Sequence, residues 1–257
     1  MTAAQQLAHE VIGDGPNALV FTHGFTQTRA SWRNVARTVV ASVPASRAIL
    51  VDLPGHGESR HVTADIAETA RLVTECGGQA IYIGYSLGAR VVLDALVNQP
   101  QVQRAVVVSG TAGFDNDSER HDRAGADELL AQRLETIGVE AFVDEWLALP
   151  LFADVPLAAN QREERVSNTA QGLADSLRRC GQGTQMPLWR DLAVSTTPLL
   201  AIAGSLDAKY VAHARRLATT APHATLRIIT DAGHATHLVA PQLVADEIIH
   251  WITNPTA

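Results

Sequence analysis

The sequence predicts an α/β fold with a mainly parallel central sheet, helices on both faces and an inserted block of helices. Short apolar runs rich in Val, Ile and Leu recur along the chain without strict alternation, which is typical of strands covered on both faces. Stretches with helical periodicity separate the early runs, and such alternation is typical of βαβ units. Between about residues 112 and 190 the strand-like runs give way to charged, helix-favouring segments.

Six apolar runs are expected to form the strands of one sheet. In chain order they are 18–22, 48–52, 80–85, 104–109, 198–204 and 225–230. Two stretches with helical spacing, 64–75 and 87–97, lie between the early runs and are expected to be crossover helices. A parallel sheet built this way collects the loops that follow its strands at one edge.

The middle of the chain is expected to form a helical lid over that edge. Its helix-favouring segments are 123–137, 139–147, 160–166 and 171–180, and prolines punctuate them. We therefore divide the chain into a first core portion at 1–111, a lid at 112–190 and a second core portion at 191–257.

Composition and charge exclude several classes of protein. The 257 residues include 27 acidic and 20 basic side chains, a net charge of −7, and the only lysine is Lys209. An acidic chain without a basic run is a poor nucleic-acid binder, and 46% hydrophobic residues argue against disorder. We expect neither a transmembrane helix nor a secretory leader. Two distant cysteines, Cys76 and Cys180, match no metal spacing and favour a reducing cytoplasm.

The strongest local motif is Gly84-Tyr85-Ser86-Leu87-Gly88, a G-x-S-x-G sequence. An apolar run precedes it and a helical pattern follows it, which is the strand–turn–helix context of a nucleophile elbow. The glycines allow a tight turn and close backbone approach. The turn is expected to expose the Ser86 hydroxyl and to place the Leu87 N–H at a helix N-terminus, where it can donate to a developing oxyanion.

A serine nucleophile or base needs a histidine, and the histidine needs an acid that orients it. Asp207 follows the run at 198–204, and His234 follows the run at 225–230. The order Ser86, Asp207, His234 is that of the α/β-hydrolase fold. Asp231 is a rival acid, but it lies three residues from His234 on the same predicted loop.

The remaining histidines are not expected to carry chemistry. His234 and His237 form an H-x-x-H pair, but no third ligand lies nearby, so we expect no metal. His56 lies in a Gly-rich turn after a strand and is interpreted as structural.

The loop after the run at 18–22 is expected to supply a second oxyanion donor. It reads His23-Gly24-Phe25. Gly24 allows the backbone to approach the site, which makes the Phe25 N–H the candidate donor. A simple strand-to-loop turn remains the alternative.

Several basic side chains could give the pocket near Ser86 a positive charge that favours an anionic ligand. Arg90 lies one helical turn after Ser86 and could face an anion or pair with a neighbouring carboxylate. Composition alone does not choose among the lid arginines Arg120, Arg123, Arg162 and Arg165. Trp146 could line the pocket or pack within the lid, and Lys209 could face the pocket or the solvent.

Several sequence blocks, taken together, carry a narrower resemblance. They are His23-Gly24-Phe25 with Trp32, Asp52-Leu53-Pro54-Gly55-His56-Gly57, Gly84 to Arg90, Phe142 to Trp146 with Leu149 to Phe152, Arg165 with Ser167-Asn168, Gly204 to Tyr210, and Ala232 to His237. The chain resembles the 2-succinyl-6-hydroxy-2,4-cyclohexadiene-1-carboxylate synthase family of menaquinone biosynthesis, within the α/β-hydrolase superfamily. Two features depart from the family pattern: Ala89 stands in place of a common Gly, and the stretch Leu238-Val239-Ala240 before Pro241 lacks the usual Glu.

The resemblance implies a lyase reaction without metal or cofactor. That family eliminates pyruvate from 2-succinyl-5-enolpyruvyl-6-hydroxy-3-cyclohexene-1-carboxylate, a small substrate with three carboxylates. The resemblance implies that Ser86, activated by His234 and Asp207, removes a ring proton, while Phe25 and Leu87 form the oxyanion hole. The implied substrate-binding residues are Tyr85, Arg90, Arg123, Trp146, Arg165 and Lys209, with Arg120 as an alternative to Arg123.

Two other classes of function remain open from the sequence. A serine hydrolase such as a carboxylesterase, thioesterase or carbon–carbon bond hydrolase would use Ser86 as a nucleophile. A non-catalytic small-molecule receptor could also keep these motifs, because a fold does not fix a function.

Overall fold

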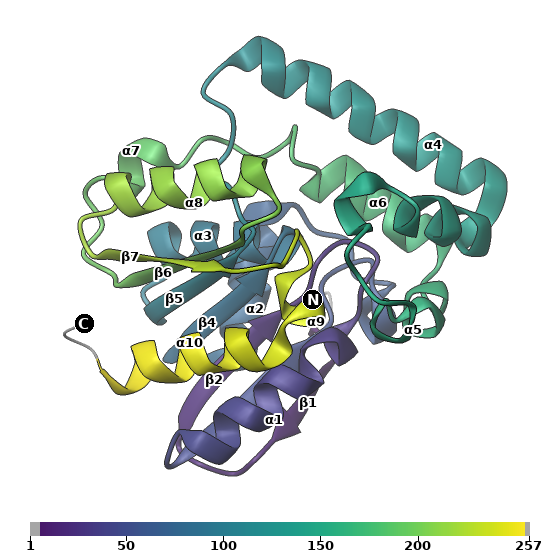
Figure 1. Cartoon of the computed structure of the whole chain (residues 1–257). Coiled ribbons are helices and arrows are strands. Elements are labelled where there is room, and N and C mark those ends of the chain that lie inside the picture. The colour runs from purple at the N-terminus through teal and green to yellow at the C-terminus, as the bar shows by residue number, and fades with distance from the viewer. Residues whose placement is uncertain (1–5, 255–257) are drawn as a thin grey trace, which may run out of the picture.

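A computed structural model describes residues 6–254 and contains one seven-stranded sheet (Figure 1). The strand order is β1-β3-β2-β4-β5-β6-β7, and only β1 is antiparallel to its neighbour. The strands are β1 His9–Ile12, β2 Asn17–Thr22, β3 Ser46–Val51, β4 Ala80–Tyr85, β5 Val102–Val108, β6 Leu199–Gly204 and β7 Ala224–Ile229. Six of them match the predicted runs within two residues, so the predicted α/β fold is confirmed.

Helices cover both faces of this sheet and bury two apolar clusters. One face carries α2 Ile66–Gly77, α3 Leu87–Asn98 and α8 Ala208–Thr220, and the other carries α1 Arg33–Ser42 and α10 Pro241–Thr253. Side chains of the central strands alternate between the two clusters, as Val20 and Phe21 do on β2. Burial on both faces explains the continuous apolar runs in the sequence.

A helical insertion lies between β5 and β6, at one end of the sheet (Figure 1). Gly138, with φ of 80°, breaks the backbone of its longest helix. The insertion contains α4 Asp117–Leu147, α5 Arg162–Val166, α6 Ala170–Cys180 and α7 Trp189–Leu192, with 3-10 turns at Pro150–Phe152 and Leu157–Ala159. Helices α4 and α6 share a small apolar cluster of their own. The division at 112–190 into lid and core stays a prediction.

Strand β1 is the one strand that the apolar pattern did not predict. It has four residues, HEVI, of which two are exposed, and it pairs with β3 at the sheet edge. A short edge strand has no fully buried face, so it leaves no apolar run. None of the helices in residues 6–254 is long and apolar enough to cross a membrane.

Two glycines let α3 pack closely against the sheet. A Cβ atom on Gly88 would overlap the carbonyl oxygen of Thr22 at the end of β2, and a Cβ on Gly84 would overlap the Gly88 carbonyl. The Gly88 N–H donates to the His23 carbonyl at 3.0 Å. The start of α3 is therefore held against the loop that follows β2.

Gly88→Ala is expected to lower the free energy of unfolding by about 3 kcal/mol, because the added methyl group meets backbone atoms that cannot rotate away. Urea unfolding would measure the change. Gly125→Ala is the matched control, since nothing lies within 4 Å of a Cβ at this glycine of α4. The control is expected to gain about 0.5–1 kcal/mol. Equal stability of the two variants would contradict the close packing of α3.

Candidate active site

Ser86 occupies the turn between β4 and α3. Its backbone has φ of 51° and ψ of −104°, an unfavourable conformation for a residue with a side chain. The Ser86 N–H donates to the Val108 carbonyl at 3.0 Å, which ties the turn to β5. Helix α3 begins at the next residue, Leu87. This geometry lifts the Ser86 hydroxyl above the carboxyl edge of the sheet.

Ser86, His234 and Asp207 form one hydrogen-bonded chain. The Ser86 Oγ lies 3.1 Å from Nε2 of His234, and Nδ1 of His234 lies 2.9 Å from Oδ2 of Asp207. The other carboxylate oxygen of Asp207 accepts the Tyr210 N–H at 3.2 Å at the start of α8. Burial alone would raise the pKa of Asp207, but the bonds from His234 and Tyr210 outweigh it and lower that pKa. An ionised Asp207 keeps a proton on Nδ1 and leaves Nε2 free to accept one.

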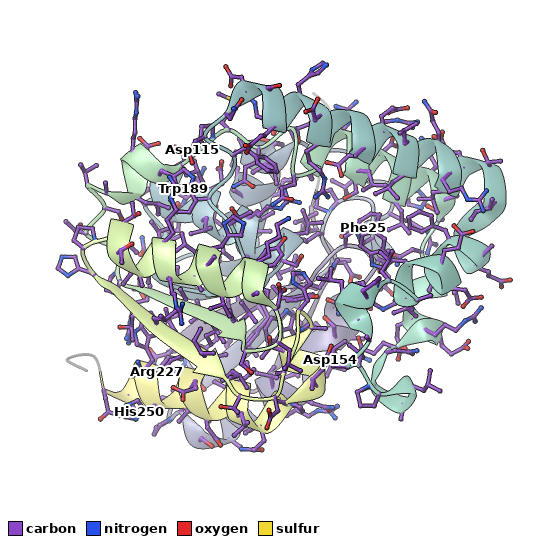
Figure 2. All side chains as sticks on the ribbon, turned by 45° about the horizontal axis from the view of Figure 1, so that its top comes forward. Phe25, Asp115, Asp154, Trp189, Arg227 and His250 are labelled. Atoms are coloured by element: carbon purple, nitrogen blue, oxygen red, sulfur yellow. The ribbon has the colours of Figure 1, made fainter. Side chains whose placement is uncertain are left out.

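The rival acid Asp231 forms no hydrogen bond or ion pair with the His234 ring, whose Nδ1 lies against Asp207. Its backbone N–H donates to Ser205 Oγ at 3.0 Å, and the residue is exposed. The loop around His234 is held instead by Ser109 Oγ, which donates to the His234 carbonyl at 2.8 Å. Asp154 of the insertion accepts the Gly233 N–H, and Figure 2 shows it beside the C-terminal segment. The structure thus places Asp207, and not Asp231, against the histidine.

Phe25 and Leu87 line the same cavity as Ser86, and both have a backbone N–H group without an acceptor within residues 6–254. The Leu87 N–H belongs to the first turn of the twelve-residue helix α3. Gly24 is needed before Phe25, because a Cβ there would overlap the ring of Tyr85. Both N–H groups are therefore free to receive negative charge, which the positive end of α3 also favours.

A cavity of about 190 Å³ opens above Ser86. Four cationic side chains line it, against one carboxylate, that of Asp127. The predicted site residues that line this cavity are Phe25, Tyr85, Ser86, Leu87, Arg90, Arg123, Trp146, Arg165, Lys209 and His234. Asp207 lies behind His234. Figure 2 shows Phe25 beneath the helices of the insertion, so the cavity lies between the insertion and the sheet.

Arg90 is buried and bonded to backbone rather than to a carboxylate. Its guanidinium donates to the carbonyls of Cys180 at 2.7 Å and Gly181 at 3.2 Å. Burial lowers the pKa of Arg90, yet an arginine stays protonated in proteins. Among the described residues it forms no ion pair, so its positive charge is not neutralised.

Arg123, and not Arg120, faces the cavity. Arg123 Nε donates to Asp127 Oδ1 at 2.8 Å, and its Nη1 donates to Gln182 Oε1 at 2.7 Å. Arg120 instead pairs with Asp117 at 2.8 Å and contacts Met186. Arg162 pairs with Asp144 on the exposed side of the insertion.

Arg165 reaches the cavity from α5 and is only 1% exposed. It donates to the Asn160 carbonyl at 2.8 Å, to the Phe25 carbonyl at 3.5 Å and to the Thr26 hydroxyl. Burial lowers the pKa of Arg165 to about 10, so the side chain remains charged at neutral pH. No carboxylate within residues 6–254 forms an ion pair with it.

The other predicted pocket residues surround the serine. Tyr85 is buried, and its ring lies 5.3 Å from that of His234. Trp146 packs edge-on against Phe25, and its buried Nε1 has no partner within the described residues. Lys209 lies at the rim, where burial and the charge of Arg123 lower its pKa.

Sequence reasoning missed several residues at the cavity, among them Asp127, Gln182 and Tyr210. Asp127 is one helical turn after Arg123, a spacing that could have signalled the pair. Tyr210 follows Asp207 by three residues, the spacing of an N-cap and its partner. Gln182 has no local signal, because only the packing of α4 against the segment after α6 brings it to Arg123.

Three further histidines are buried behind the site, namely His23, His56 and His237. Nδ1 of His56 lies 2.9 Å from the Pro54 carbonyl, and its Nε2 has no partner within the described residues. Burial, helped by neighbouring charges, lowers the pKa of His23 to about 4 and that of His56 to about 3. His237 stacks between Trp32 and Tyr85. These rings are neutral supports of the loops that carry Phe25 and His234.

A Ser–His–Asp chain on an elbow above a mainly parallel sheet defines a protein of the α/β-hydrolase class. A model of the alpha/beta hydrolase family matches residues 19–247, so the chain belongs to that family. A 2-succinyl-6-hydroxy-2,4-cyclohexadiene-1-carboxylate synthase of Escherichia coli O1:K1 is 33% identical over 87% of this chain and 88% of its own length. One from Serratia proteamaculans is 29% identical over 92% and 93%.

Solved structures agree with these relatives. MenH from S. aureus superposes with a TM-score of 0.88 at 25% identity and covers 97% of this chain and 99% of its own. A malate-bound esterase from Thermogutta terrifontis has a TM-score of 0.83 at 20% identity, over 98% and 94%, and shows the shared fold alone. Within the α/β-hydrolase class, the chain belongs to the 2-succinyl-6-hydroxy-2,4-cyclohexadiene-1-carboxylate synthase family.

The buried His56 is expected to make stability depend on pH. Because its folded-state pKa is about 3 and an unfolded histidine titrates near 6.5, the unfolded chain binds the extra proton between these values. Stability is full above about pH 6.5 and falls as the pH drops towards 3. From pH 7 to pH 5 this histidine is expected to account for a loss of about 2 kcal/mol.

Urea unfolding of His56→Asn at both pH values would measure this loss, since Asn retains a donor for the Pro54 carbonyl but does not titrate. The variant is expected to lose about 2 kcal/mol less than the wild type between pH 7 and pH 5. His121→Asn serves as the control, because His121 is exposed. The same loss in His56→Asn as in the wild type would contradict the neutral buried ring.

Proposed function

We propose that this protein is a 2-succinyl-6-hydroxy-2,4-cyclohexadiene-1-carboxylate synthase of menaquinone biosynthesis. It is a cofactor-independent lyase that eliminates pyruvate from 2-succinyl-5-enolpyruvyl-6-hydroxy-3-cyclohexene-1-carboxylate. The observation that carries the proposal is the cavity, which four cationic side chains and Ser86 line together. A small substrate with three carboxylates matches that charge, and the named relatives support its identity.

In the proposed reaction Ser86 acts as the base. His234 Nε2 accepts the hydroxyl proton, and the Ser86 oxygen removes a proton from the substrate ring. The proton leaves C2, and its electron pair forms the C2=C3 double bond. The existing C3=C4 double bond shifts to C4=C5 as the C5–O bond to the enolpyruvyl group breaks. The leaving enolpyruvate takes up a proton and becomes pyruvate. Asp207 orients His234 and stabilises its positive charge.

The oxyanion hole and the arginines share the charge of the substrate. Charge that develops on the ketone oxygen of the succinyl group during proton removal is received by the N–H groups of Phe25 and Leu87. Arg90, Arg123 and Arg165 bind carboxylates through charge-assisted hydrogen bonds. The rest of the substrate site consists of Tyr85, Trp146 and Lys209. Tyr85 and Trp146 form its walls and can donate hydrogen bonds, and Lys209 adds a positive charge at the rim.

The serine-hydrolase alternative has no specific observation in its favour. A neutral ester would not need the three buried or half-buried arginines that line the cavity, and the solved esterase supports only the fold. We also propose a cytoplasmic location, for which the free thiols of Cys76 and Cys180 are suited.

Ser86→Ala is expected to lower kcat for pyruvate release about a thousandfold, because it removes the proposed base. The assay follows pyruvate from the enolpyruvyl substrate, beside turnover of p-nitrophenyl esters. Ser118→Ala, at an exposed position of α4, is the control and is expected to leave the rates of pyruvate release and ester turnover unchanged. Rapid ester turnover by the wild type without pyruvate release would reject the lyase, and a covalent Ser86 adduct in the intact mass would indicate a nucleophile.

Arg123→Gln is expected to raise KM about 10–100-fold, the loss of one charge-assisted contact to a substrate carboxylate. Glutamine can still hydrogen-bond to Asp127, which limits the structural damage. Arg120→Gln provides a matched control from the same helix face, because Arg120 contacts Asp117 and Met186 and does not line the cavity. If the two variants change KM equally, Arg123 does not bind substrate.

A further inference from the structure

Thr26, the residue after Phe25, is held in a strained conformation. Its φ of 67° lies in the left-handed region, and its side chain is fully buried. A β-branched residue adopts this region only when its surroundings enforce it. The loop that carries the Phe25 N–H therefore depends on outside contacts for its shape.

Two side chains of the insertion supply those contacts. Asn168 Nδ2 donates to the Thr26 carbonyl at 2.7 Å. Arg165 donates to the Thr26 hydroxyl and to the Phe25 carbonyl. On the other side of Phe25, the Gly24 carbonyl, which shares a peptide group with the Phe25 N–H, accepts the Gln27 N–H at 3.1 Å. The peptide groups on both sides of Phe25 are thus tied down.

Both the oxygen and the nitrogen of the Asn168 side-chain amide form hydrogen bonds. Its Oδ1 accepts the Gly57 N–H at 2.7 Å, and its Nδ2 also donates to the Arg165 carbonyl at 2.9 Å. The residue is only 4% exposed. Because it accepts at one end and donates at the other, neither Asp nor an apolar residue of the same size can replace it.

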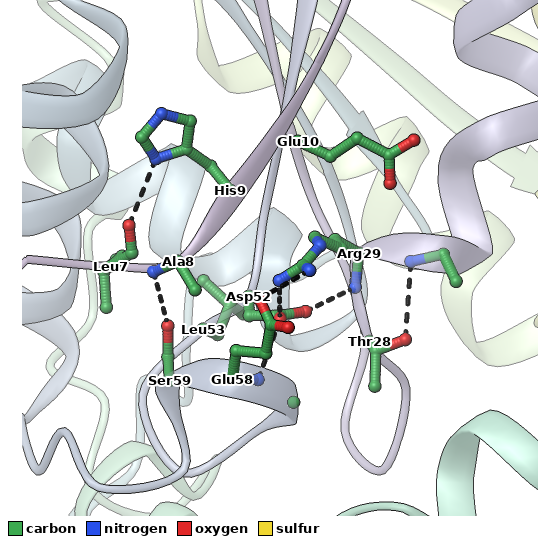
Figure 3. A network of polar contacts seen from close by, with 12 residues as sticks. Leu7, Ala8, His9, Glu10, Thr28, Arg29, Asp52, Leu53, Glu58 and Ser59 are labelled. Carbon is green, nitrogen blue, oxygen red and sulfur yellow. Dashed lines mark hydrogen bonds and ion pairs between the residues drawn. The ribbon is translucent and has the colours of Figure 1, made fainter.

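The Gly57 turn is a rigid anchor for this amide. Asp52 accepts the Glu58 N–H at 3.0 Å and the Arg29 N–H at 2.7 Å and pairs with the Arg29 guanidinium, as Figure 3 shows. A Cβ on Gly57 would overlap the Asp52 carboxylate. Asn168 therefore spans the distance between a fixed turn of the core and the strained loop at Thr26.

We propose that Asn168 is a positioning residue that aims the Phe25 N–H at the charge developing on the substrate. The inference rests on the proposed function, in which that N–H forms part of the oxyanion hole. Asn168 also donates to the Arg165 carbonyl. One side chain of the insertion is therefore bonded both to a proposed substrate-binding arginine and to the loop that carries the Phe25 N–H of the proposed oxyanion hole.

Asn168→Asp tests the proposal in the full-length protein. Asp keeps the acceptor for Gly57 but loses the donor to Thr26 and sets a carboxylate against two carbonyls. We expect kcat for pyruvate release to fall about 10–100-fold, since a displaced oxyanion donor costs somewhat less than a deleted one. KM is expected to stay within about threefold, because Arg90 and Arg123 are untouched and the Arg165 guanidinium keeps its own bonds to Asn160 and Thr26.

Asn116→Asp is the matched control in the same insertion. Asn116 is exposed and uses only its oxygen, which accepts the Ser118 N–H, so its kcat and KM are expected to be unchanged. If Asn168→Asp does not fold, Asn168→Ser gives the same test without a buried charge, since serine cannot span both partners.

The outcomes separate the two proposals. A wild-type protein that releases no pyruvate rejects the proposed function. An active wild type whose Asn168 variants keep kcat rejects the positioning role. A rise in KM at unchanged kcat also rejects it, because that result would mean that Asn168 serves only to hold Arg165.

Discussion

The tight turn at Ser86 is the constraint on which the rest of the site depends. Its strained backbone, with φ of 51°, puts the hydroxyl at the carboxyl edge of β4, where the loops after β6 and β7 bring Asp207 and His234. The same turn starts α3 at Leu87, and Gly88 allows that helix to press against the end of β2. One local geometry therefore brings together the proposed base, its hydrogen-bonded partners and the two proposed oxyanion donors.

The charge of the cavity follows from what its arginines are bonded to. Arg90 and Arg165 donate to backbone carbonyls and, within residues 6–254, form no ion pair. A carbonyl dipole orients a guanidinium without cancelling its charge, whereas a carboxylate would neutralise it. Burying these cations costs solvation free energy, which an anionic ligand would offset. A chain of net charge −7 can thus contain a strongly positive pocket.

The helical insertion does more than cover the cavity. It supplies Arg123, Trp146 and Arg165 to the wall, and two of its side chains brace loops of the core. Asp154 holds the Gly233 N–H next to the catalytic-site histidine, and Asn168 holds the carbonyl of Thr26 next to Phe25. The loops that bear the proposed base partner and oxyanion donor are therefore completed only when the insertion packs on the sheet.

The sheet, the elbow and the chain order of serine, acid and histidine could be predicted from the sequence, because each has a local signature. These signatures are an apolar run, a pair of glycines, and a polar residue just after a strand. Parallel strands then bring those residues to one edge. The sequence favoured Asp207 over Asp231, and the structure places Asp207 against His234. Only the tertiary structure distinguished Arg123 from Arg120 and showed the edge strand β1 and the contacts of Asn168. These depend on distances between segments far apart in the chain, which no local pattern encodes.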